Sequence, residues 1–160
     1  MKKILATIIL TFMLASLQFS AHAQHGEKAV GILAGYNSQN NSGIAGLYFQ
    51  YRCNSWLRLS PDCQILIKHK DRSAFQFDGN AHFLINIFPK ANIYPLVGLT
   101  YQNWKAYNSG SSNKNRIGGN IGAGFEVMAT STLKVAVEGK YSAVKDFSAG
   151  NVFVSIGYVF

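Results

Sequence analysis

The sequence has 160 residues, of which 48% are hydrophobic and 14% charged, and its formal net charge at pH 7 is +8. This length suits one domain and excludes two of ordinary size. The positive charge does not indicate nucleic-acid binding, because the excess basic residues are spread over separate connections of a chain whose N-terminus marks it for export.

The first 23 residues have the composition of a secretory signal peptide. Two lysines precede an apolar run over residues 4–17, and Ala21-His22-Ala23 has the small-x-small pattern that signal peptidase accepts. The run is shorter than the ~20 residues that a membrane-spanning helix needs. We therefore expect residues 1–23 to be removed, with a mature chain that begins at Gln24.

Turn-forming residues divide the mature chain into eight segments of alternating hydrophobicity, the pattern of β-strands with two unlike faces. The segments are Lys28–Tyr36, Gly43–Tyr51, Trp56–Lys68, Ala74–Phe88, Ile93–Trp104, Ile117–Val127, Leu133–Val144 and Asn151–Phe160. Membrane-crossing strands need about 9 to 11 residues, whereas strands of soluble sandwiches have about 5 or 6. The lengths and the even number predict that residues 24–160 form an all-β domain, an eight-stranded antiparallel up-and-down transmembrane β-barrel.

Alternation alone does not say which face of the strands points inward. A soluble exported β-barrel that binds a small apolar ligand would place the apolar phase inside, whereas a barrel in lipid would place it outside. Four residues of each sign occupy the polar phase, and this balance favours an enclosed space in which charges must be paired. The predicted interior charge network consists of Arg58, Asp62, Lys68, Asp78, His82, Glu126, Lys134, Glu138 and Lys140. Because side chains can fill the inside of eight strands, we expect a closed interior rather than an open pore.

The remaining positive charge lies in the connections between segments. With both termini on the periplasmic side, the connections at 37–42, 69–73, 105–116 and 145–150 face outward. Their basic residues, which we call the basic rim, are Lys70, Arg72, Lys105, Lys114, Arg116 and Lys145. We expect this rim to meet the phosphates of lipopolysaccharide, or a host or neighbouring surface protein. An ordinary solvated loop surface is the alternative.

Aromatic residues fall near the segment ends, as in the interfacial girdles of a membrane barrel. Tyr158 and Phe160 belong to the last segment, where Phe160 is expected to close the strand at the periplasmic interface. The two cysteines, Cys53 and Cys63, are not expected to form a disulfide. Ten residues of mostly extended chain separate them by roughly 20 to 30 Å, against about 4.4 to 6.8 Å between the Cα atoms of a disulfide.

Five stretches carry a resemblance to a known family: "WLRLSPD", "YPLVGLTYQNW", "GGNIGAGFEV", "LKVAVEGKYS" and "VSIGYVF". The whole mature chain resembles the small outer-membrane β-barrel proteins of the porin-family, OmpA/OmpX-like type. The resemblance implies a barrel in the bacterial outer membrane, inserted by the assembly machinery that recognises a terminal aromatic such as Phe160. The resemblance is nearly silent about activity, because the shared stretches describe lipid-facing alternation. Our leading hypothesis is a structural or surface-interaction role.

Catalysis has one local candidate in the sequence. Some eight-stranded outer-membrane barrels modify lipid A, and His69, Asp71 and Ser73 stand close together in "HKDRS". A short hairpin without supporting residues holds such groups poorly. His82 stands alone in the polar phase of its segment, as a member of a hydrogen-bond network rather than a base. We therefore expect no enzyme, no metal ligands and no cofactor, with a lipid A-modifying enzyme as an open alternative.

Overall fold

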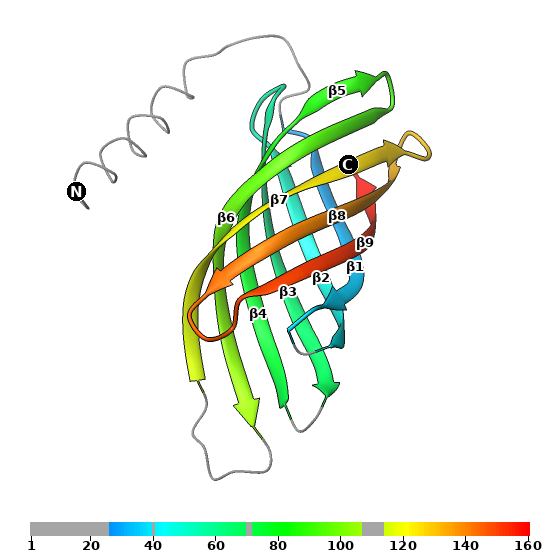
Figure 1. Ribbon diagram of the computed structural model, residues 1–160. Helices are drawn as coiled ribbons and strands as arrows, with labels where there is room; N and C mark the ends of the chain where they lie inside the picture. The colour runs from blue at the N-terminus through cyan, green and yellow to red at the C-terminus, as the bar shows by residue number, and fades with distance from the viewer. Residues whose placement is uncertain (1–25, 40, 70–71, 107–113) are drawn as a thin grey trace, which may run out of the picture.

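The computed structural model describes residues 26–39, 41–69, 72–106 and 114–160, which form a closed β-barrel (Figure 1). The predicted signal peptide, residues 1–23, lies outside this part of the chain. No helix among the described residues is long and apolar enough to cross a membrane.

In the described part of the chain nine strands make up a single antiparallel sheet. They are β1 (Lys28–Asn37), β2 (Ser42–Arg52), β3 (Leu57–His69), β4 (Arg72–Phe83), β5 (Ile85–Phe88), β6 (Ala91–Ala106), β7 (Lys114–Met128), β8 (Leu133–Val144) and β9 (Ala149–Val159). Each pairs with its neighbours in the chain, except that β4 and β5 do not pair with each other, and the pairings β1–β9 and β4–β6 close the ring. The prediction of eight strands is confirmed to within a few residues at each end, except that the segment 74–88 is interrupted at Leu84. That segment forms β4, which belongs to the ring, and β5, which pairs with β6 alone.

The strands are staggered around the ring. A path that starts at Lys28 and steps from each residue to its partner on the next strand reaches Gly150 at the start of β9. The Gly150 carbonyl accepts from the Ser38 N–H, so the path returns to the first strand at Ser38. The offset from Lys28 to Ser38 is ten residues. Strand number and stagger together set the width of a barrel, and eight strands leave an interior that side chains just fill.

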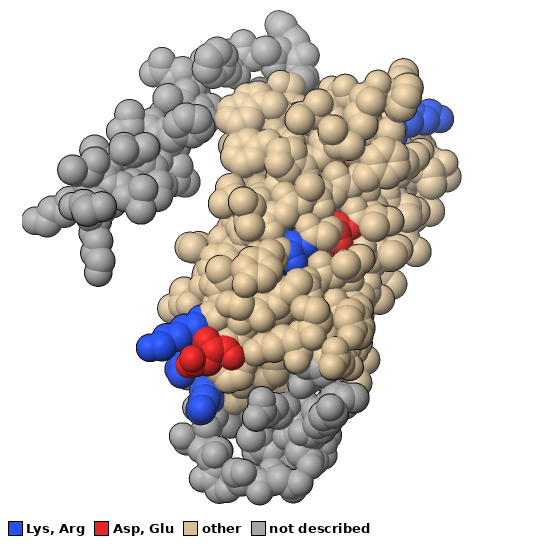
Figure 2. Space-filling model, in the orientation of Figure 1, with Lys and Arg blue, Asp and Glu red and all other residues tan. Residues whose placement is uncertain are grey.

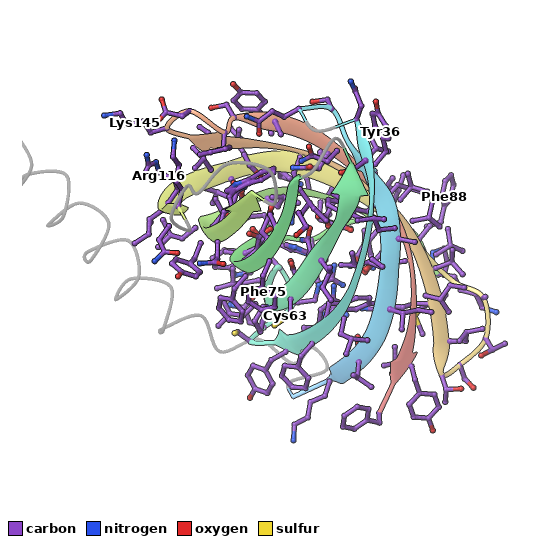
Figure 3. The ribbon with its side chains drawn as sticks, turned by 90° about the horizontal axis from the view of Figure 1, so that it is seen from below. Tyr36, Cys63, Phe75, Phe88, Arg116 and Lys145 are labelled. Carbon is purple, nitrogen blue, oxygen red and sulfur yellow. The ribbon has the colours of Figure 1, made fainter. Side chains whose placement is uncertain are left out.

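The two faces of the wall differ as the alternation predicts. Outward side chains are apolar and exposed, for example Ile117 at 75% and Leu99 at 70% exposed. Gln64, Gln76 and Asp78 point inward with 0% exposed. Apolar residues outside and polar residues inside are the reverse of a water-soluble barrel, so the soluble alternative is wrong. Figure 3 shows Cys63 and Phe75 directed away from the ring, and both cysteines are free.

The barrel has two unlike ends. The strand ends that are joined by the connections β1–β2, β3–β4, β6–β7 and β8–β9 lie at one end, called the loop end, at the bottom of Figure 1. The first described residues and the C-terminus lie at the opposite end, called the termini end, together with the connections β2–β3, β5–β6 and β7–β8. At the termini end Asn54 shapes the β2–β3 turn, since its Oδ1 accepts from the N–H groups of Trp56 (3.0 Å) and Leu57 (2.7 Å). Asp146, at the loop end, has a φ of 68°, which aspartate adopts more readily than most residues.

Candidate functional site

An apolar layer fills the barrel near the loop end. Its members are Leu33, Ile44, Tyr48, Leu66, Ala74, Trp104, Val144, Phe147 and Phe153. Phe147 belongs to the β8–β9 connection and stacks on Trp104 with ring centroids 4.8 Å apart. The connection thereby inserts an aromatic ring into the interior, which narrows the barrel on the loop side.

Lys140 organises a polar layer on the termini side of the apolar layer. Its Nζ lies 2.5 Å from Asp78 Oδ2 and 3.6 Å from Asp62 Oδ2, and it sits 4.9 Å from the centroid of the Phe153 ring. The amides of Gln64 and Gln76 donate to the same two carboxylates. One lysine therefore holds two carboxylates from adjacent strands, and the glutamines satisfy most of the remaining acceptors.

Arg58 organises a second charged layer nearer the termini end. Its Nη1 donates to both carboxylate oxygens of Glu126, at 2.8 and 2.6 Å, across the barrel from β3 to β7. The guanidinium also lies over the Tyr94 ring, 5.0 Å from its centroid. Lys134 adds a second cation 3.8 Å from Glu126 and donates to Gln50. Both partners of the Arg58–Glu126 pair are almost fully buried, so the pair holds opposite walls together.

His82 and Glu138 lie beside this layer. Arg58 Nη2 is 3.0 Å from His82 Nδ1, and because arginine can only donate, Nδ1 accepts and Nε2 carries the ring proton. His82 Nε2 points towards Glu138 Oε2 at 3.9 Å, and Tyr94 donates to the same carboxylate at 3.1 Å. His82 is thus a network member, held by stacking on Tyr94 at 4.5 Å.

The structure brings most of the predicted interior network together. Arg58, Asp62, Asp78, His82, Glu126, Lys134, Glu138 and Lys140 all point inward, while the side chain of Lys68 lies outside the described part of the structure. Among described side chains no lysine or arginine lies within 4.0 Å of Glu138, whose carboxylate accepts a hydrogen bond from Tyr94.

Sequence reasoning missed the neutral members of the network. Gln64, Gln76, Gln102, Asn80 and Asn120 share the inward phase with the charges and link them by hydrogen bonds. Their position in the polar phase was a usable signal. Tyr94 carried no such signal, because an aromatic at a strand end equally suits the interfacial girdle.

The loop end carries the described part of the basic rim. Lys114 and Lys145 are exposed, and Arg116 Nη2 lies 3.3 Å from Asp146 Oδ2. Figure 2 shows charged side chains gathered at this lower end, below a band with few charges, and Figure 3 shows Arg116 and Lys145 on the same side of the rim. Lys70 and Asp71, and the side chains of His69, Arg72 and Lys105, lie outside the described part, so the candidate cluster His69–Asp71–Ser73 is not placed.

The termini end opens into a cavity of about 850 Å³. The β5–β6 hairpin lines one side, and Glu27, Arg52 and Phe160 lie among the lining residues contributed by the rest of the mouth. Tyr158 and Phe160 are exposed on the outer face and stack with centroids 6.3 Å apart, as expected for girdle residues. Among the described residues no group of three histidine, cysteine or acidic side chains is arranged to hold a metal ion.

These features define a membrane β-barrel, and comparison with known proteins identifies its family. Residues 7–160 match the family described as the outer membrane protein beta-barrel domain, to which the chain therefore belongs. The protein is thus a small β-barrel of the bacterial outer membrane. A search of the curated proteins finds no match.

Solved structures of outer-membrane barrels share the fold. The N-terminal β-barrel domain of OprF from Pseudomonas aeruginosa aligns with a TM-score of 0.74 and 16% identity, covering 85% of this chain and 98% of that one. Neisserial surface protein A aligns with 0.68 and 14%, covering 84% and 96%. Ail, the attachment invasion locus protein of Yersinia pestis, aligns with 0.62 and 16%, covering 86% and 100%. At these identities the likeness concerns the fold alone.

Proposed function

We propose that this protein is a non-conducting outer-membrane barrel that presents its loop end to anionic partners at the cell surface, above all lipopolysaccharide. The observation that carries the proposal is the filled interior. Because the Lys140 layer, the Arg58 layer and the apolar layer fill the inside of the barrel, the interior serves to hold the wall together. Any binding function therefore lies at the two ends of the barrel.

The interior argues against an open pore because its polar groups are engaged with one another. A conducting channel needs water along its whole length, whereas Arg58, Lys140 and Asp78 are each at most 4% exposed. Stranding one member of such a buried pair is costly, typically about 3 to 5 kcal/mol, so transient opening through these layers is strongly disfavoured.

The basic rim is the part of the loop end suited to an anionic partner. Lys114 and Lys145 are exposed, whereas Arg116 is partly neutralised by Asp146. A basic residue near an anionic membrane surface contributes about 1 kcal/mol, reduced by salt. Ail, a barrel of the same fold, has been solved with the heparin analogue sucrose octasulfate. A host or neighbouring surface protein with an acidic face is the second partner class that the same rim fits.

Lipopolysaccharide binding is tested with a charge-neutral variant of the rim. Lys114→Gln combined with Lys145→Gln should weaken binding of nanodisc-embedded protein to lipopolysaccharide by about 10- to 30-fold at low salt, from about 2 kcal/mol before screening. Lys28→Gln combined with Lys90→Gln changes the net charge equally at the termini end and should leave binding unchanged. Equal loss of binding in both variants would contradict a role for the rim. Equal binding of the wild-type protein to lipopolysaccharide with phosphorylated and with dephosphorylated lipid A would contradict it as well.

Conductance is tested directly in planar bilayers. The purified wild-type protein should give no steady single-channel currents, and Lys114→Gln should not alter that result. Reproducible currents that scale with salt concentration would show a water-filled path through the barrel and would contradict the proposal that it does not conduct.

A further inference from the structure

β5 is the only strand of the described chain that pairs on one side alone. The β3–β4 ladder ends at Leu57 opposite Phe83, because the chain turns between β2 and β3. The last bond across this boundary runs from the Leu84 N–H to the Trp56 carbonyl, at 2.7 Å. β5 continues the line of β4 beyond that point and leaves an edge with no strand beside it (Figure 1). Such an edge presents unpaired backbone N–H and C=O groups.

The apolar side chains of β5 are exposed as well. Ile85 is 51%, Ile87 45% and Phe88 67% exposed. The stretch from Asn86 to Lys90 also lines the cavity of about 850 Å³ at the termini end. Clefts of this size hold small ligands and peptide side chains. A free strand edge and a cavity therefore meet at one place.

We propose that the edge of β5 binds an extended peptide segment of a periplasmic protein, which adds to the sheet as one further strand in line with β3. Of the candidate occupants, only an extended chain offers alternating backbone donors and acceptors to an edge. Lipid tails have no such groups, and the backbone groups of a helix are already hydrogen-bonded within the helix. Alternate side chains of the added strand would lie in the cavity, which is the recognition mode of strand addition.

Local features limit the addition to one short segment. β5 has four residues, and Pro89, which has no N–H, follows it directly. Short edges ended by proline or lysine do not support continued strand growth, which is how natural sheets avoid aggregation. This surface is at the opposite end from the basic rim, so the proposal does not depend on lipopolysaccharide binding.

The test uses mature protein in phospholipid nanodiscs and a fluorescent probe peptide, acetyl-Thr-Val-Thr-Val-Thr-amide. Fluorescence anisotropy should show saturable binding, at least tenfold weaker for a peptide with the same side chains and every second amide N-methylated. Backbone N–H directions alternate along a strand, so the Asn86 N–H faces the same open side as that of Leu84. Asn86→Pro should weaken binding at least tenfold, and Asn86→Ala should not.

Three outcomes would overturn the proposal. Equal binding of both peptides would show apolar partition without backbone pairing. Unchanged binding to a folded Asn86→Pro variant would remove the edge from the contact. Disulfide-linked dimers of Asn86→Cys, made in a Cys53→Ser and Cys63→Ser background and formed without any peptide binding, would assign the edge to a second copy. The N-methylated peptide requires no variant, so the test holds even if Asn86→Pro does not fold.

Discussion

Replacing Glu126 with leucine tests whether the charged layers hold the barrel together. The change removes the acceptor of two Arg58 bonds, at 2.8 and 2.6 Å, and of a 3.0 Å bond from Asn92. It also removes the nearby countercharge of Lys134, and the side chains of Arg58 and Lys134 are only 2% and 3% exposed. Loss of one partner of a buried pair costs about 3 to 5 kcal/mol, because the remaining charge stays poorly solvated.

A loss of that size is a large share of the stability of most folded proteins, about 5 to 15 kcal/mol. It corresponds to more than a hundredfold change in the unfolding equilibrium. Urea unfolding in lipid vesicles, followed by the fluorescence of Trp56 and Trp104, measures the change. The matched control is Asp146→Asn, which removes the charge of the more exposed pair with Arg116 and keeps a residue that tolerates the positive φ of this position, so it should cost less than about 1 kcal/mol.

A double variant separates a stranded charge from lost packing. Arg58→Met with Glu126→Leu removes both charges, so it should be less destabilised than Glu126→Leu alone. If Glu126→Leu costs no more than Asp146→Asn, the interior charges are hydrated, and the argument for a closed barrel fails.

Two further predictions concern the wall and its insertion. Gly122→Ala would place a Cβ 2.7 Å from the Lys140 Cα and should lower the free energy of unfolding by about 1 to 3 kcal/mol in the same urea assay. Gly139→Ala, on the neighbouring strand, would place a Cβ with nothing within 4 Å and should be close to neutral. Equal costs would contradict this account of the close strand contact. Phe160→Asp places a charge on the exposed outer face at the termini end, so it should lower the yield of heat-modifiable barrel in the membrane far more than Asn115→Asp at the loop end. Similar yields from the two variants would contradict a role of Phe160 in assembly.

The sequence predicted the strands and their faces because alternation is a local property. Each residue of a strand points opposite to its neighbours, so the phase of Lys134, Glu138 and Lys140 in one segment assigns all three to one face. The sign balance of the charged residues then indicated that this face is the inside. The assignment of faces needs only a window of about ten residues, and the sign balance needs only a count of charges along the segments.

The partners of those residues were decided only by the tertiary structure. Arg58 meets Glu126 across 68 positions of sequence, and Lys140 meets Asp78 across 62. Which residues share a layer depends on the registers of all the strand pairs, whose sum sets the ten-residue stagger, and no single segment contains that information.

The interruption at Leu84 depends on tertiary structure for the same reason. Alternation continues from Ala74 to Phe88 without a local signal for a break. Whether the later part of this segment has a neighbour depends on where β3 begins, which the β2–β3 turn determines from elsewhere in the chain. The sequence by itself therefore determined a barrel with a polar inside, whereas the cross-barrel pairs and the free edge of β5 required closure of the ring.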